Sequence, residues 1–314
     1  MNLSSIVSTK SPALLFVNPQ AGGGHAESYL PRVLRFFSSQ EFPVEAVRTQ
    51  SAEDLEERAR AALKRGQRLL IAMGGDGAFQ GLVNAAYGSV ALLGLLPAGG
   101  GNDFAAALGI PADPVAAALA LIHGWPRWTD LLRARTADGC ERLYVGGGGV
   151  GLDAEAAKFA SGAFRNLPGT LRYVAAALWA LRGFSPLEIT LTFPEDALAP
   201  MRTTALLAAA LNTPSYGAGL RLAPEARPDD GWLDAVVVEK MGFLEILEIL
   251  PRLAQRGAGE IPVLKSFRAR RVRLAPDRPC QFHGDGEIFG PAPVDIEVVP
   301  RAVQVLAPEN SQQA

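Results

Sequence analysis

Three glycine-rich segments in the first half of the chain carry residue types that can bind phosphate and metal. Gly74-Gly75-Asp76-Gly77 follows the apolar run Leu69–Met73 and precedes a helical pattern. Glycine backbone comes close to a phosphate, and the amides of a helix N-terminus attract anions. A carboxylate in such a turn repels phosphate unless a cation lies between them. Asp76 therefore indicates Mg²⁺ beside a bound phosphate, although one glycine turn alone is weak evidence.

The other two segments, Asn18–Gly24 and Pro97–Phe104, also follow short apolar runs. In open α/β sheets, ligands bind at the carboxyl edge of the strands, where the three segments would meet. Together they favour a nucleotide site. The alternative is that the glycines only form turns and the aspartates cap helices. The candidate nucleotide-binding residues are Asn18, Gly22, Gly74, Gly75, Asp76, Gly77, Gly99, Gly101, Asn102 and Asp103.

Strand and helix patterns alternate over residues 13–128, which predicts a doubly wound parallel α/β sheet. Ser51 is a predicted helix N-cap, with Asp54 three residues later. The predicted strands are Leu14–Val17, Val44–Arg48, Leu69–Met73 and Leu92–Leu96.

From about Thr129, strand-like runs dominate, so a mainly antiparallel β domain is predicted there. The predicted strands are Leu131–Arg135, Arg142–Val145, Leu187–Phe193, Thr203–Leu211, Leu233–Val238, Ser266–Leu274, Val294–Val299 and Ala302–Leu306.

The composition agrees with a globular protein of two domains. The 314 residues are 48% hydrophobic and 20% charged, so a large core is possible. The formal net charge of -2 indicates no general attraction to nucleic acid. We find no apolar stretch long enough to span a bilayer and no signal-peptide pattern at Met1–Pro12. We expect a cytoplasmic protein whose membrane contact, if any, is peripheral at the inner face.

Several motifs, in this order, resemble those of the diacylglycerol kinase-like lipid kinases, which include bacterial lipid kinases and sphingosine kinases. No single motif is specific, but their joint occurrence is, and the resemblance runs almost end to end. The matching segments are Asn18–Gly22, Gly74–Ala78, Pro97–Ala105 with Leu108–Pro111, Gly149–Ala154, Leu222–Ala226, Asp229–Asp234 and Asp285-Gly286-Glu287.

This resemblance implies an N-terminal α/β nucleotide domain, a β-sandwich-like C-terminal domain and an active site in the cleft between them. The expected domains are residues 1–128, joined by a returning segment at about 304–314, and residues 129–303. ATP is the implied phosphate donor and a lipid the implied acceptor. The sequence leaves the oligomeric state open, with a homodimer as one option.

The resemblance also implies residue roles. Asp285 would be the general base that takes the proton of the acceptor hydroxyl, and Glu287 would join Asp76 and Asp103 in holding Mg²⁺. A second, structural Mg²⁺ would be held by the Asp230 side chain and by the backbone carbonyls of Arg227 and Trp232. The alternative for Asp285-Gly286 is an ordinary hairpin turn, which often uses this pair.

The chain departs from the family pattern near the expected phosphates. Ala21, Ala78 and Gly100 stand where the family has hydroxyl residues, and Gln80 stands where it usually has glutamate. Each missing hydroxyl removes a hydrogen bond worth about 0.5–1.5 kcal/mol. We therefore favour an altered or weak kinase. The alternatives are a non-catalytic nucleotide- or lipid-binding homologue and a kinase of a soluble alcohol.

A lipid acceptor requires an apolar slot. The candidates are the helical stretch Leu171–Leu181, with Tyr173 and Trp179, and the region of Phe159, Phe164 and Leu167. The alternative is that these residues are ordinary core positions.

Overall fold

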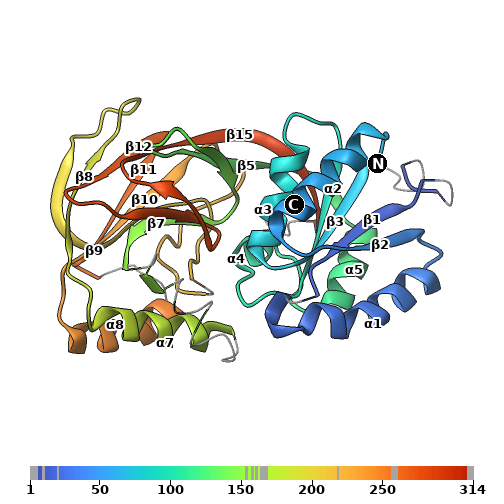
Figure 1. Ribbon diagram of the computed structural model, residues 1–314, viewed down its shortest axis with the longest axis horizontal. Helices are drawn as coiled ribbons and strands as arrows, with labels where there is room; N and C mark the ends of the chain where they lie inside the picture. Colours follow the sequence, from blue (N-terminus) through green and yellow to red (C-terminus); the bar gives the residue numbers. More distant parts are fainter. Residues whose placement is uncertain are drawn as a thin grey trace. The chain divides into compact units, whose positions relative to one another are not determined.

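The computed structural model describes residues 6–8, 11–19, 21–152, 155–156, 159, 162, 169–217, 219–255 and 261–309, of which 169–174 and 254–255 are described by backbone alone. The chain divides into two compact units (Figure 1). Unit 1 comprises Met1–Thr129 and Arg301–Ala314, and unit 2 comprises Asp130–Pro300. Strands β5 (Trp125–Arg135) and β15 (Val294–Ala307) contribute to both units. Each unit is described separately below.

Unit 1 contains the predicted parallel α/β sheet, with the strand order β2-β1-β3-β4. The end of β15 pairs with β4 in parallel, and Gln304 lies opposite Leu92. All residues of β1, β3 and β4 are buried, as expected for a sheet covered on both faces. The strand bounds are Ala13–Val17 for β1, Val44–Arg48 for β2, Leu69–Gly74 for β3 and Leu92–Pro97 for β4.

Helices cover both faces of this sheet, with α1 and α5 packed together on one face and α2 and α3 on the other (Figure 1). Helix α2 begins as predicted: the Ser51 side chain accepts the Asp54 amide at 3.2 Å, and the Asp54 side chain accepts the Gln50 amide at 2.9 Å. The helix bounds are α1, His25–Ser39; α2, Ala52–Lys64; α3, Asp76–Ala86; α4, Asp103–Ala107; and α5, Pro114–Ile122.

Unit 2 is the predicted antiparallel, β-sandwich-like domain. One path of strands runs β14-β13-β7-β9-β8-β12-β15, while β10 pairs with β9 and β11, and β5 pairs with β15 and β6. The further strand bounds are β6, Glu141–Tyr144; β7, Gly147–Gly151; β8, Leu187–Thr192; β9, Met201–Leu211; β10, Leu233–Glu239; β11, Leu264–Ala269; β12, Arg271–Pro276; β13, Gln281–Gly284; and β14, Glu287–Pro291.

The core of unit 2 is lined by inward residues from most of these strands, with Tyr144, Phe282 and Phe289 in mutual ring contact. Unit 2 also contains two helices, α7 (Gly169–Leu181) and α8 (Phe243–Gln255) (Figure 1). Helix α8 leaves Phe243, Leu244 and Leu247 exposed. None of the helices in the described part of the chain is both long and apolar enough to span a membrane.

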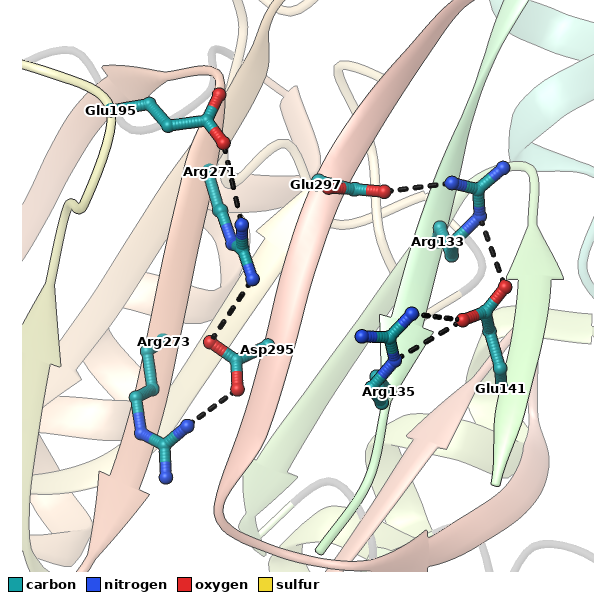
Figure 2. Close-up of polar contacts among 8 residues, drawn as sticks. All are labelled: Arg133, Arg135, Glu141, Glu195, Arg271, Arg273, Asp295 and Glu297. Atoms are coloured by element: carbon teal, nitrogen blue, oxygen red, sulfur yellow. Dashed lines mark hydrogen bonds and ion pairs between the residues drawn. The ribbon is translucent and has the colours of Figure 1, made fainter. Parts of the chain in front are cut away.

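Alternating charges join neighbouring strands on one face of unit 2 (Figure 2). Arg271 pairs with Glu195 and Asp295, and Asp295 also pairs with Arg273. Nearby, Arg133 pairs with Glu297 at 2.8 Å and with Glu141 at 3.4 Å, and Glu141 also holds Arg135. Exposed pairs contribute little individually, so the main effect is to match opposite charges across the strand register.

The structure differs from the predicted strands at several places. Strands β13 and β14 were not among the predicted strands, and β5 begins at Trp125 instead of Leu131. Strand β7 was not predicted, because its glycines lack the side chains that mark a strand. The predicted run Ser266–Leu274 is two strands, β11 and β12, which meet at Arg270. The two runs predicted after Val294 form one strand, β15, which continues through Pro300 and Arg301.

Candidate functional site

The three glycine-rich turns of unit 1 follow β1, β3 and β4, at the carboxyl edge of the sheet. The strand order reverses between β1 and β3, and ligands bind at such a point in doubly wound sheets. The turns after β3 and β4 are tied together by backbone bonds. The Ala98 amide donates to the Gly74 carbonyl at 2.9 Å, and the Asp76 amide donates to the Gly101 carbonyl at 3.3 Å.

Close backbone approach explains two of these glycines. A Cβ on Gly99 would lie 2.4 Å from the Gly75 Cα, which no side chain permits. A Cβ on Gly22 would lie 2.3 Å from the Ala98 carbonyl oxygen, and the φ of Gly22 is +61°. The first turn therefore packs on the third, and the third packs on the second. The predicted residues Asn18 and Gly101 lie in these turns, Gly74 is the last residue of β3, and Gly77 lies in the first turn of α3.

Asp76 links two of the turns through its side chain. It is the first residue of α3, and its carboxylate accepts the amides of Asp103 at 3.0 Å and Phe104 at 3.3 Å. These amides begin α4, so Asp76 caps that helix from another segment. Capping, which was the simpler alternative, is therefore one role of this carboxylate. Asp103 itself is buried.

Asn102 has an unused acceptor at this edge. Its side-chain Nδ2 donates to the Gly99 carbonyl at 3.1 Å, whereas its Oδ1 is buried without a hydrogen-bond partner. An unpaired buried acceptor is costly, and a donor group of a bound ligand would satisfy it.

The residues present are compatible with Mg²⁺ at this edge. Mg²⁺ keeps several waters and commonly takes only one or two carboxylates together with substrate phosphates. Each oxygen of Asp76 accepts one backbone amide, and a carboxylate oxygen has two lone pairs. Mg²⁺ bound there by Asp76 and Asp103 would neutralise charge on the phosphates.

Asp285 lies in unit 2, in the hairpin between β13 and β14. Asp285 and Gly286 form its two-residue turn, with φ of 51° and 88°. These values fit the type I′ hairpin turn. The hairpin alternative is therefore correct as local structure, and the turn aims the Asp285 side chain back at the end of another strand.

Three backbone amides hold the Asp285 carboxylate. Val145 and Gly146 donate at 2.7 and 2.9 Å, and Gly147 donates at 3.3 Å. The Asp285 amide donates to the Gly147 carbonyl at 3.0 Å. These bonds stabilise the ionised carboxylate and fix its position, while Asp285 remains partly exposed.

The sequence did not point to the residues that support this loop. The Asn212 side-chain amide donates to the carbonyls of Val145 at 2.9 Å and Asp130 at 3.0 Å. The backbone amide of Asn212 donates to the Gly146 carbonyl at 2.8 Å. The Thr213 hydroxyl donates to the Gly146 carbonyl at 3.3 Å. The available signal was the pair of polar residues directly after the predicted strand Thr203–Leu211.

Two tyrosines pack around the Asp285 loop. Tyr144 is buried; its hydroxyl donates to the Ala210 carbonyl at 3.2 Å. Burial, together with the charge of Asp285, raises the pKa of Tyr144 well above its usual range. The Tyr216 hydroxyl lies 3.2 Å from His283 Nε2, and the Tyr216 ring fills the space beside Gly147.

The other predicted metal residues of unit 2 lie at two places. Glu287 is exposed at the start of β14, two residues after Asp285. Arg227, Asp230 and Trp232 lie in the loop before β10, where Arg227 is exposed and the Asp230 carboxylate is paired with Arg268.

Unit 2 also contains a pocket of about 900 Å³. Phe159 and Trp179, both predicted for a lipid slot, line it together with Phe184. Arg182 and Arg278 also line it, and the Arg182 guanidinium lies 5.4 Å from the Trp179 ring centre. The pocket thus combines aromatic walls with the charged side chains of Arg182, Arg278 and Glu155. Of the other slot residues, Phe164, Leu167 and the Tyr173 side chain lie outside the described residues.

Family models match both parts of the chain. The diacylglycerol kinase catalytic domain matches residues 12–134, and the YegS C-terminal NAD kinase beta sandwich-like domain matches residues 148–307. The chain belongs to the diacylglycerol kinase family of lipid kinases. Within this family, the glycine turns of unit 1 fall in the catalytic-domain match, and the Asp285 hairpin falls in the C-terminal match.

Relatives cover nearly the whole length of the chain. It is 29% identical to a diacylglycerol kinase of Mycobacterium tuberculosis over 297 residues, which is 93% of this chain and 94% of the relative. It is 26% identical to a diacylglycerol kinase of Bacillus subtilis, covering 96% and 98% of the two chains. A crystal structure of a diacylglycerol kinase from Bacillus anthracis matches with a TM-score of 0.71 and 18% identity over 95% of this chain and 97% of that one, which supports the fold.

Proposed function

We propose that this chain is an ATP- and Mg²⁺-dependent lipid kinase that phosphorylates a hydroxyl of a diacylglycerol-like lipid. The acceptor oxygen forms a bond to the γ-phosphorus, the bond from that phosphorus to the β–γ bridging oxygen breaks, and ADP leaves. The proton of the acceptor hydroxyl passes to the Asp285 carboxylate. Such transfers depend mainly on positioning and charge stabilisation.

The observation that carries this proposal is the fixed Asp285 carboxylate, held by three amides at 2.7–3.3 Å. A carboxylate fixed in this way can orient an alcohol without a further loss of conformational entropy in its own side chain. Asp76, Asp103 and Glu287 are the proposed Mg²⁺ ligands, and the backbone amides of the glycine turns are the proposed phosphate donors.

The pocket of unit 2 supports a lipid acceptor. Its aromatic residues Phe159, Trp179 and Phe184 offer apolar surface to a hydrocarbon chain. Transfer to such a lipid requires peripheral contact with a membrane surface, which we propose at the inner face.

A second candidate is a non-catalytic homologue that binds nucleotide or lipid. The absence of hydroxyls at Ala21, Ala78 and Gly100 motivates it. The backbone amides of the turns do not depend on these side chains, so we favour catalysis. A kinase of a soluble alcohol would share Asp285 but would not need the apolar pocket.

The test is transfer of labelled γ-phosphate from ATP, with Mg²⁺, to diacylglycerol in phospholipid vesicles and to a total lipid extract. Asp285→Asn should abolish labelling while ATP still binds. Asp277→Asn, an exposed aspartate of the same unit, is the matched control and should label normally. ATP binding without labelling of any lipid or soluble alcohol would instead favour the binding homologue.

A further inference from the structure

The Asp230 loop of unit 2 is closed by groups of this chain. Asp230 Oδ1 accepts the Trp232 amide at 3.1 Å, and Asp230 Oδ2 forms an ion pair with the guanidinium of Arg268. Asp230 is the residue whose carboxylate is expected, from the family resemblance, to bind a structural Mg²⁺. Both oxygens of this carboxylate therefore already have a partner in the chain.

The strand register and an aromatic ring place this guanidinium. Arg268 on β11 lies directly opposite Asp234 on β10. Its guanidinium carbon lies 5.6 Å from the centre of the Trp232 ring, and that of Arg270 lies 4.8 Å from the same ring. Arginine on an indole face is a favourable cation–π contact, so Arg268 is held by the ring as well as by the ion pair.

Several carboxylates surround the loop. Asp130 is buried and its Oδ2 accepts the Gly231 amide at 2.6 Å, while Asp234 is nearly buried opposite Arg268. The charges of Asp130 and Asp229 act on Asp230. Partly buried carboxylates that repel one another require a compensating cation.

A divalent ion does not fit this arrangement. Mg²⁺ on either oxygen of Asp230 would share this carboxylate with a guanidinium that already carries a positive charge, and Mg²⁺ demands near-octahedral geometry.

We propose that the Arg268 guanidinium is the resident cation of the Asp230 loop and takes the place where the sequence predicts a structural Mg²⁺. Because this cation is part of the chain, unit 2 keeps its loop closed without divalent ions. The inference does not depend on kinase activity, and its test measures only metal binding and stability.

The experiment uses terbium, an oxygen-binding cation that emits when a nearby tryptophan is excited, on the full chain without nucleotide. The wild-type protein and the Asp230→Asn variant should show the same Trp-excited terbium emission. Arg268→Gln should show increased terbium emission, and excess Mg²⁺ should reverse the increase. The double variant Arg268→Gln/Asp230→Asn should not show the increase. Arg270→Gln, which touches the same ring without an ion pair to Asp230, is the matched control and should gain none.

Thermal unfolding supplies the second measurement. Arg268→Gln should lower the Tm in EDTA by about 2–4 °C and recover it in Mg²⁺, whereas Arg268→Lys should stay close to wild type. Wild-type emission that requires Asp230 would overturn the proposal, because a metal would then displace Arg268. An Arg268→Gln protein without Asp230-dependent metal binding would also overturn it, because the loop would then have no place for a cation.

Discussion

The carboxylate of Asp76 accepts the backbone amide of Asp103 at 3.0 Å and thereby joins two turns that are 27 residues apart in the chain. Asp76, one predicted metal ligand, thus caps the start of α4, where Asp103, another predicted ligand, lies. The proposed Mg²⁺ site and the local fold consequently share a single side chain, and their contributions have to be separated by experiment.

Asp76→Ala should affect both stability and activity. Loss of the cap on α4 should lower the free energy of unfolding by about 1 kcal/mol. Loss of a Mg²⁺ ligand should reduce phosphate transfer by about 100-fold or more. Urea unfolding and the transfer assay measure the two effects.

The control is Asp113→Ala, because Asp113 caps α5 through the amides of Val115 at 3.0 Å and Ala116 at 2.9 Å. It should lose similar stability but keep its activity. Equal activity of the two variants would contradict a metal role for Asp76.

Gly99→Ala should disrupt the contact between the turns after β3 and β4. The new Cβ would meet the Gly75 Cα at 2.4 Å and the Gly75 nitrogen at 2.6 Å, and both belong to backbone that cannot rotate away. We expect a loss of about 1–3 kcal/mol in unfolding free energy and a weaker affinity for ATP, measured by calorimetry. Gly183→Ala, where a Cβ meets no atom within 4 Å, should change neither quantity. Unchanged ATP affinity in Gly99→Ala would show that this contact does not shape the nucleotide site.

Asn212→Ala should disorder the loop that holds Asp285. It removes the donors to Val145 at 2.9 Å and to Asp130 at 3.0 Å, so unfolding free energy should fall by about 1–3 kcal/mol. If the loop positions Asp285, kcat for lipid phosphorylation should fall while the KM for ATP stays constant. Steady-state kinetics would argue against this positioning role if kcat were unchanged in a folded variant.

Asp234 makes stability depend on pH. Burial, reinforced by the charges of Asp230 and Glu225 and opposed by Arg268, raises the pKa of Asp234 to about 6. The folded protein therefore binds more protons than the unfolded chain between about pH 4 and pH 6, so this group makes stability fall as pH rises through that window.

Asp234→Asn cannot ionise and should become more stable relative to wild type as the pH rises from 4 to 7. The gain should be on the order of 1–2 kcal/mol, after allowance for solvent screening. Urea unfolding at pH 4.5 and pH 7 measures the difference between the two proteins. An identical difference at both pH values would contradict a raised Asp234 pKa.

Local sequence patterns predicted the parallel strands of unit 1 and the Ser51 cap. These features are determined by a few neighbouring residues, since apolar runs, glycine and capping side chains act within one turn or one strand. Strand β7 escaped prediction for the same reason, because its glycines carry no local signal and its position depends on pairing with β9 and β13.

The sequence by itself determined the resemblance to the diacylglycerol kinase-like lipid kinases, the two-part organisation and the glycine-rich segments, and it offered a hairpin at Asp285 as one alternative. Only the tertiary structure placed the Asp285 carboxylate on the amides of residues about 140 positions earlier, and Arg268 on Asp230. Such contacts depend on strand register and on the direction of individual side chains. Both are fixed by packing between distant segments, which no local pattern encodes.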